Sequence, residues 1–171
     1  MAEWQISPLS KAHDRSDFSC GKPDLDRFLL ELSSQYDKKD YARTFVLTRS
    51  DSPVVLGYFT LSASLISLEV LPGETRRRLP KHPAPVAQIG RLAVDLSVRG
   101  ERLGEKLLVE ALRLIEQAGV TLAVCAVEVV ALDEAAKGFY LKYGFAELLD
   151  DPLHLYLPTK SVRKMLAAVT P

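Results

Sequence analysis

The chain has 171 residues, of which 47% are hydrophobic and 26% are charged, and its formal net charge at pH 7 is zero. This balance excludes a protein that is held to nucleic acid or to an acidic membrane by its overall charge, although it does not exclude a local basic patch. The first ten residues lack the basic and apolar regions of a signal peptide, and no apolar run approaches the roughly 20 residues that span a bilayer. The two cysteines are far apart and the three histidines lack metal-ligand spacing, which favours free thiols and argues against a zinc site. We therefore expect one cytoplasmic globular domain over residues 1–171, with no metal and no membrane partner.

The N-terminal third of the sequence predicts a strand, a helix and an antiparallel hairpin. "WQISPL" is a short first strand, and "FSCGKPDLDRFLLEL" reads as a turn followed by a helix that starts near Pro23, because proline suits the first helical turn. Apolar residues recur at helical spacing and define one face of this helix: Leu25, Phe28, Leu29 and Leu32. A polar stretch follows, "SSQYDKKDYAR". Two β-branched and aromatic runs then flank "RSDSP", which predicts a hairpin.

The remaining chain alternates strands with helices. "LPGETRRRLPKHPAP" is a loop with room for one helical turn, and the apolar run Val86–Val94 predicts a central strand that is buried on both faces. A helix follows, with an apolar stripe formed by Leu103, Leu107, Leu108, Ala111, Leu112 and Ile115. Gly119 is placed to end that helix. After the strand "TLAVCAVEVV", Asp133 can cap a short helix that stops at Gly144, and "DPLHLYLPT" and "KSVRKMLAAV" predict a last strand and helix. This order predicts an α/β protein with a mixed sheet.

The junction "LAVDLSVRGERLGEKLL" places a glycine-containing loop between a buried strand and the start of a helix. Unpaired N–H groups at a helix start form an anion site, and glycine lets the backbone approach a phosphate closely. Arg99 and Arg102 add positive charge beside it. The alternative is an ordinary strand-to-helix turn with solvated arginines, and the loop taken alone favours that alternative. The segment is neither a P-loop nor a dinucleotide fingerprint, because it matches neither pattern.

The same junction resembles the acetyl-CoA-binding motif Q/R-x-x-G-x-G/A of the GNAT N-acetyltransferases, with Arg99 at its start and Gly104 at its end. Arg102 stands where the family has its middle glycine, and its amide can still donate to a phosphate if the local backbone is right-handed. The resemblance implies the GNAT fold, in which helices flank a central mixed, mostly antiparallel β-sheet, and it implies acetyl-CoA as the co-substrate. The cofactor-binding residues that it implies are Leu92, Ala93, Val94, Arg99, Gly100, Arg102, Leu103, Gly104, Asp133, Ala136 and Phe139.

A second stretch, "ALDEAAKGFYLKYGF", resembles the family segment A-x-x-F-Y-x-x-x-G-F, which places Tyr140 beside the thioester sulfur of acetyl-CoA. A phenol there can protonate the departing thiolate as a general acid, whereas Phe139, Tyr143 and Phe145 are better explained by packing. "FSCGKPDLDRFL", "GYFTLSA" and "DDPLHLYLP" resemble the TacT/AtaT-like tRNA-acetylating toxins of toxin–antitoxin systems. That branch implies the α-amine of an aminoacyl-tRNA as the substrate, a small ribbon-helix-helix antitoxin as a partner, and a homodimer.

The sequence does not single out a general base. Asp95, Glu128 and Asp133 are candidates, but residues at such positions are more often caps, loop residues or surface residues. An α-amine titrates near ~7.7–8.0, against ~10.4 for a lysine amine, so a useful fraction is already neutral and water could take the proton.

Two basic clusters are candidates for contact with tRNA, because phosphate binding needs only a local patch. One contains Arg76, Arg77, Arg78 and Lys81, and the other contains Lys38, Lys39 and Arg43. The alternative for both clusters is a solvated face. Two other functions also stay open at this point, namely acetylation of a protein N-terminus, peptide or small amine, and a non-catalytic CoA-binding regulatory module.

Overall fold

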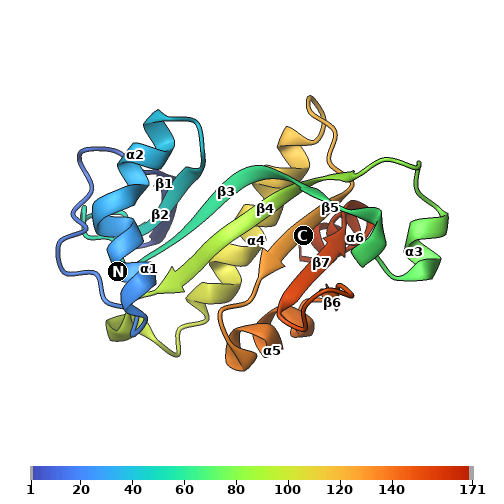
Figure 1. Cartoon of the computed structure of the whole chain (residues 1–171). Coiled ribbons are helices and arrows are strands. Elements are labelled where there is room, and N and C mark those ends of the chain that lie inside the picture. The colour runs from blue at the N-terminus through green and yellow to red at the C-terminus, as the bar shows by residue number, and fades with distance from the viewer. Residues whose placement is uncertain (1, 170–171) are drawn as a thin grey trace. The chain divides into compact units, whose positions relative to one another are not determined.

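The computed structural model describes residues 2–169 (Figure 1). Its strands are β1 (Trp4–Pro8), β2 (Arg43–Arg49), β3 (Gly57–Ile66), β4 (Ala84–Val94), β5 (Ala126–Val130), β6 (Ala146–Glu147) and β7 (His154–Pro158). Its α-helices are α1 (Pro23–Arg27), α2 (Ser33–Lys38), α3 (Gly73–Arg77), α4 (Leu103–Ala118), α5 (Glu134–Lys142) and α6 (Thr159–Val169). Short segments of other helical form accompany them: the π-helix η1 (Phe28–Leu32) and the 3₁₀-helices η2 (Leu68–Val70) and η3 (Leu96–Val98).

The strands of the described chain form one sheet in the order β1-β2-β3-β4-β5-β7-β6. The pairs β1–β2, β2–β3, β5–β7 and β6–β7 are antiparallel. The chain divides into two compact units, one made of residues 2–62 and 89–111 and the other of residues 63–88 and 112–169, and β3, β4 and α4 run through both. The α/β class predicted from the sequence is confirmed.

The first unit contains the predicted first strand, helix and hairpin. β2 and β3 form the hairpin, and residues 50–56 connect them, a longer connection than the "RSDSP" turn that we expected. In Figure 1, α1 and α2 lie in front of β1 and β2. Phe28 and Leu29 are buried, and Leu25 and Leu32 pack against the same cluster, so the predicted apolar helical face is the face that forms the core.

The polar stretch after Leu32 is helical up to Lys38, which the sequence did not predict. Serine usually weakens a helix because its hydroxyl competes for backbone hydrogen bonds. Here Ser33 is buried, and its Oγ donates to the carbonyl oxygen of Leu29 at 2.6 Å while it accepts from Nη1 of Arg15 at 2.8 Å. A side chain from a distant part of the sequence therefore satisfies this serine inside the helix.

The prediction that Val86–Val94 is buried on both faces was wrong in part. β4 begins earlier, at Ala84, and its side chains alternate between the two faces. Ala84 and Val86 are buried on one face and Ile89 and Ala93 on the other, while Gly90 is exposed. Each face is therefore packed along only part of its length.

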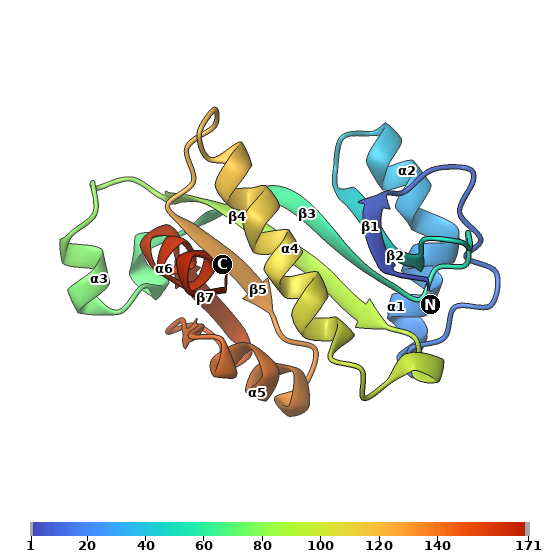
Figure 2. The same cartoon turned by 180° about the vertical axis from the view of Figure 1, so that it is seen from behind.

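The apolar stripe predicted for α4 is buried at every one of its positions. The helix ends where expected, because the N–H of Gly119 donates to the carbonyl oxygen of Ile115 at 2.9 Å. Figure 2 shows α4 in front of β4. Among residues 2–169, no helix combines the length and the apolar character that crossing a membrane requires.

The second unit contains the short strands and helices that follow α4. β5 pairs with β7, and the two-residue strand β6, which was not predicted, pairs with the other side of β7. The proline-containing loop holds its single helical turn as α3. A core of buried residues from this unit includes Ile66, Val86, Ala126 and Tyr156.

Candidate active site

The loop before α4 is built from the end of β4, the turn η3 and a glycine. Gly100 has a φ of +86°, in the left-handed region that costs an L side chain roughly 1–2 kcal/mol. A Cβ added at Gly100 would meet no heavy atom within 4 Å, so glycine is required by conformation rather than by space. The loop leads into the 16-residue helix α4, whose first N–H groups have no partner within the helix. This geometry suits an anion such as a pyrophosphate.

Asp95 fixes the start of this loop. Its Oδ1 accepts from the N–H and Oγ of Ser97 at 2.9 and 2.7 Å, and its Oδ2 accepts from the N–H of Ser19 at 2.9 Å. Burial raises the pKa of this carboxyl, but the hydrogen bonds from Ser19 and Ser97 outweigh burial and hold the pKa below its usual value. Both oxygens are engaged, so Asp95 is an anchor of the loop and a poor candidate for a base.

The segment "FSCG", residues 18–21, supports the same loop, and we call it the brace. Nη2 of Arg99 donates to the carbonyl oxygen of Cys20 at 3.0 Å, and the N–H of Leu96 donates to the carbonyl oxygen of Ser19 at 2.8 Å. Gly21 has a φ of +89°, and a Cβ added there would lie 3.3 Å from Nη2 of Arg99. Burial raises the pKa of the Cys20 thiol to about 11, which leaves that sulfur protonated and unreactive.

Arg102 has a φ of +58°, so its backbone is left-handed and the condition that we set for its amide contact, a right-handed backbone, is not met. The turn into α4 needs a left-handed residue here, a conformation that the family's glycine adopts without strain and that costs arginine roughly 1–2 kcal/mol. The side chain is 78% exposed, and its Nε lies 3.1 Å from Oε2 of Glu105. Arg102 therefore adopts the same left-handed conformation as the glycine that it replaces. The hydrogen bond from its amide to a phosphate, which required a right-handed backbone, loses its basis.

The other predicted site residues lie on α5 or just before it. The side chain of Asp133 accepts from the N–H of Ala136 at 2.9 Å and caps the helix, as predicted. A residue in that role supports the helix and is a poor candidate for a base. The helix ends at Lys142, and Gly144 follows with a φ of +93°, which allows the chain to turn back into β6.

Tyr140 is held among aromatic rings at the end of α5. Its ring centroid lies 5.2 Å from that of Phe139 and 5.3 Å from that of Phe145, both in edge-to-face geometry, and Phe139 also lies 5.2 Å from Tyr143. The side chain of Tyr140 is 7% exposed and Phe145 is buried, so the rings fix one another. The packing roles predicted for Phe139, Tyr143 and Phe145 are confirmed.

The hydroxyl of Tyr140 makes no hydrogen bond within residues 2–169, and its oxygen is not among the fully buried atoms that lack a partner, so it is open to a molecule outside the chain. Burial raises the pKa of this phenol, so the hydroxyl keeps its proton at neutral pH. A protonated donor without a protein partner is suited to a ligand atom.

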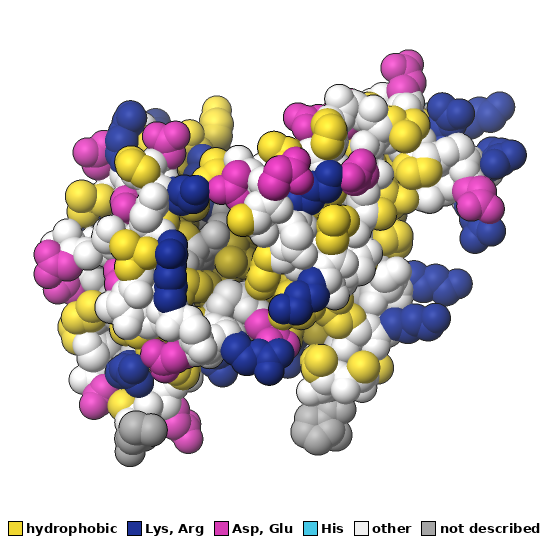
Figure 3. Space-filling view, turned by 90° about the horizontal axis from the view of Figure 1, so that it is seen from below, with side chains coloured by type: hydrophobic (Ala, Val, Ile, Leu, Met, Phe, Trp, Pro, Cys, Tyr) yellow, Lys and Arg dark blue, Asp and Glu magenta, His cyan; other side chains and the backbone are white. Residues whose placement is uncertain are grey.

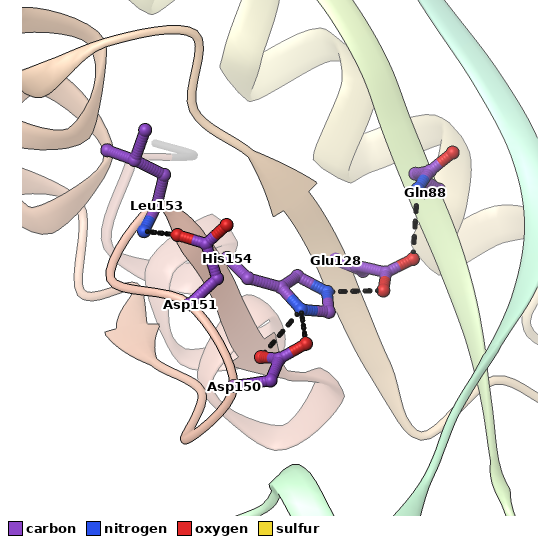
Figure 4. Close-up of polar contacts among 6 residues, drawn as sticks. All are labelled: Gln88, Glu128, Asp150, Asp151, Leu153 and His154. Atoms are coloured by element: carbon purple, nitrogen blue, oxygen red, sulfur yellow. Dashed lines mark hydrogen bonds and ion pairs between the residues drawn. The ribbon is translucent and has the colours of Figure 1, made fainter.

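Glu128 is buried on β5, in a polar network that the sequence did not reveal (Figure 4). Its Oε1 accepts from Nε2 of Gln88 at 3.1 Å, and its Oε2 lies 2.6 Å from Nε2 of His154 on β7. Nδ1 of His154 lies 3.0 Å from both carboxylate oxygens of Asp150. Burial lowers the pKa of His154, but the hydrogen bonds to Glu128 and Asp150 outweigh it and raise the pKa. Glu128 is not the surface residue that we considered, yet both its oxygens are already engaged.

The basic residues Arg76, Arg77 and Arg78 lie on α3 and at its end, and they are exposed, as is Lys81. Thr75 and Tyr156 join α3 to β7 through hydroxyl groups 3.1 Å apart. In Figure 3, dark-blue side chains project at the right edge, the side on which α3 lies in Figure 1. The structure therefore presents this cluster to solvent from a fixed position on the second unit.

The second basic cluster is only partly available. Lys38 and Lys39 are exposed and make no ion pair within the described chain. Arg43 is engaged, because Nη1 lies 2.7 Å from Oδ1 of Asp37 and Nη2 lies 2.6 Å from Oδ1 of Asp40. Two lysines, rather than all three residues, are free to contact phosphate.

Comparison with known proteins places these features in a family. The family described as acetyltransferase (GNAT) domain matches residues 41–147. A curated tRNA-acetylating toxin of Mycobacterium tuberculosis (strain ATCC 25618 / H37Rv) is 34% identical over 158 residues, which are 92% of this chain and 93% of the relative. A probable toxin TacT of Sinorhizobium fredii (strain NBRC 101917 / NGR234) is 31% identical over 170 residues, 94% of each chain.

Solved structures agree over nearly the whole chain. A tyrosine-to-phenylalanine mutant of KacT has a TM-score of 0.90 and 32% identity, covering 95% of this chain and 98% of its own. AtaT complexed with acetyl-methionyl-tRNAfMet has a TM-score of 0.89 and 28% identity, with coverages of 95% and 99%. A mutant AtaT bound to acetyl-CoA and to the C-terminus of the antitoxin AtaR has a TM-score of 0.82 and 27% identity, with coverages of 96% and 99%. The chain has the GNAT fold and belongs to the GNAT acetyltransferase family.

Proposed function

We propose that this chain transfers the acetyl group of acetyl-CoA to the α-amino group of an aminoacyl-tRNA, and that it acts as a toxin that blocks translation. Acetylation removes the nucleophile of peptide-bond formation. The observation that carries the chemistry is the protonated hydroxyl of Tyr140, which has no hydrogen-bond partner among residues 2–169 and belongs to a side chain that is only 7% exposed. The substrate rests on the relative named a tRNA-acetylating toxin and on the solved complex of AtaT with acetyl-methionyl-tRNAfMet.

The residues present fit acetyl-CoA. The start of α4 and the left-handed Gly100 offer an anion site for the pyrophosphate, and Leu92–Val94 at the end of β4 would lie along the pantetheine. When bound, acetyl-CoA supplies the acetyl group as a thioester. Asp133, Ala136 and Phe139 stay predicted contacts of acetyl-CoA. Asp133 also caps α5, so it would help to hold that helix beside the cofactor.

Tyr140 is the proposed general acid. The departing sulfur is a thiolate, whose thiol form has a reference pKa of ~8.5, so a nearby phenol can hydrogen-bond to it and protonate it, and the phenolate then regains a proton from water. The neighbouring rings of Phe139 and Phe145 hold the phenol in one orientation. The carboxylates of Asp95, Glu128 and Asp133 all have protein partners, so we propose that water takes the proton from the α-amine.

A small ribbon-helix-helix antitoxin, a homodimer and a cytoplasmic location complete the proposal. The antitoxin is supported by the structure of AtaT with the C-terminus of AtaR. Co-expression with the product of an adjacent gene, followed by size-exclusion chromatography with light scattering, measures both the complex and the number of copies of this chain within it.

The experiment that tests the function is in-vitro translation with and without acetyl-CoA, followed by mass analysis of the recovered aminoacyl-tRNA. Wild-type protein should add one acetyl group to the aminoacyl moiety. Tyr140→Phe should lower turnover by roughly 10²-fold or more with little change in acetyl-CoA affinity, because the hydrogen bond that it removes matters mostly in the transition state. Tyr143→Phe is the matched control, since this residue lies three positions away and packs on Phe139.

Three outcomes would contradict the proposal in different ways. Loss of turnover in Tyr143→Phe but not in Tyr140→Phe would reverse the roles of the two tyrosines. Acetylation of a peptide N-terminus or a small amine, but not of aminoacyl-tRNA, would contradict the proposed substrate. Binding of acetyl-CoA without turnover of any amine would indicate a regulatory module.

A further inference from the structure

A hollow lies on the surface of the first unit, at the C-terminal end of α2. Gln35, Tyr36, Lys39 and Tyr41 line it, and its volume is about 310 Å³. That volume is at the lower limit of the roughly 300–1,000 Å³ typical of small-molecule pockets, so it suits a ligand of about one nucleotide. The lining combines two aromatic rings, a carboxamide and an ammonium group.

Tyr41 is 72% exposed, which by itself is unremarkable for a single residue, but its ring is the outermost of a connected series. Tyr58 is fully buried, and its ring lies 6.3 Å from that of Phe28, which is 2% exposed. Phe28 lies 5.1 Å from Tyr36, and Tyr36 lies 6.0 Å from Tyr41, both in edge-to-face geometry. The exposed ring is therefore anchored to the core, and an anchored ring loses little freedom when a ligand stacks on it.

The turn that presents Tyr41 is also fixed. Asp40 has a φ of +60°, and Arg43 bridges the carboxylates of Asp37 and Asp40. The N–H of Tyr41 donates to the carbonyl oxygen of Tyr36 at 2.9 Å. Because Arg43 neutralises both acidic groups of the turn, the ammonium group of Lys39 is left without an ion pair within residues 2–169.

We infer that this hollow is a subsite for one unpaired nucleotide of single-stranded RNA, whose base stacks on Tyr41 while Lys39 contacts a phosphate and Gln35 meets the edge of the base. Sequence-tolerant stacking on an exposed aromatic ring beside a basic group is how proteins hold unpaired bases. The inference deepens the proposed function, on which it rests for the identity of the RNA: the nucleotide would belong to the single-stranded 3′ end of the aminoacyl-tRNA.

The test uses deacylated tRNA and a five-nucleotide RNA of the same 3′ sequence, each with 2-aminopurine in an unpaired position. Stacking on tyrosine should quench this fluorophore. Tyr41→Leu should abolish the quench and weaken binding roughly 5- to 150-fold, the range for removing an aromatic side chain on which one base stacks. Tyr41→Phe should keep the quench because it keeps the ring. Lys39→Gln should lower the salt slope of binding by about 0.7, the value for one phosphate contact on a single strand. Val120→Ala, at an exposed apolar residue of the second unit, is the control, and thermal melting reports whether each variant folds.

The outcomes separate this inference from the proposed function. Equal quenching by wild type and Tyr41→Leu, or no quenching by wild type, would overturn the subsite whatever the acetylation assay shows. If wild type quenches the fluorophore and Tyr41→Leu does not, the subsite is supported. This holds even if wild type fails to acetylate aminoacyl-tRNA, because that failure would overturn only the proposed function.

Discussion

His154 should contribute much more to stability than its neighbour Asp150. Replacing His154 with leucine leaves the Glu128 carboxylate, whose side chain is 6% exposed, with only the Gln88 amide as a donor. Removing one partner of a buried ion pair costs roughly 3–5 kcal/mol, and because His154 is itself 15% exposed we expect the lower end, about 3 kcal/mol. For a chain of this size that corresponds to a fall in Tm of roughly 6–12 °C. Urea unfolding followed by circular dichroism measures the free energy directly.

Two controls test the reasoning behind this number. Asp150 is 42% exposed, so Asp150→Asn should cost less than about 1 kcal/mol, as for other exposed pairs. The double variant Glu128→Leu/His154→Leu removes both charges and should be more stable than His154→Leu alone. Equal costs for Asp150→Asn and His154→Leu, or a double variant less stable than the single one, would refute the view that an isolated buried carboxylate causes the destabilisation.

The same network predicts a pH dependence. The pKa of His154 is raised above its ordinary value of 6.5, so the folded protein holds the proton more tightly than the unfolded chain. The stability that this adds is fully present below pH 6.5 and is lost as the pH rises through the folded-state pKa. The stability difference between wild type and His154→Leu should therefore shrink at alkaline pH, and a difference that grows there would contradict the assigned protonation.

Two further predictions concern ligand binding. Gly104→Asp should weaken acetyl-CoA binding on the order of 10-fold in calorimetry, because it adds negative charge where α4 should meet the pyrophosphate. Unchanged affinity in a folded variant would contradict binding of acetyl-CoA at the start of α4. Reversing the charges of Arg76, Arg77 and Arg78 should weaken tRNA binding and lower its salt slope by about 0.9 for each duplex phosphate that the protein no longer neutralises. The control for that variant is Lys164→Glu on α6. Equal salt slopes of tRNA binding for the triple variant and wild type would show that the α3 cluster does not contact tRNA.

Local patterns in the sequence predicted most of the fold. The apolar stripe of α4, the cap at Asp133 and the hairpin of β2 and β3 each depend on residues close together in the chain, and all are present. The GNAT family could be predicted from the loop motif and from the aromatic segment around Tyr140, and the family match confirms it.

The features that sequence reasoning missed depend on distant residues or on backbone angles. Ser33 lies in a helix because Arg15 completes its hydrogen bonds, an interaction that no periodicity reveals. Glu128 and His154 are 26 residues apart and meet only because β5 and β7 pair. The left-handed conformation of Arg102 could not be predicted, because an arginine in the sequence, unlike a glycine, does not indicate a positive φ.

The brace has a consequence for how the chain can be shortened. The family match begins at residue 41, whereas the loop that should bind the cofactor is fastened to Ser19 and Cys20, outside the matched segment. A fragment trimmed to residues 41–147 would keep the loop's sequence without this support, because Asp95 would lose its bond from Ser19 and Arg99 its bond to Cys20. A segment outside the family match thus steadies a loop inside it, and a functional fragment has to include both.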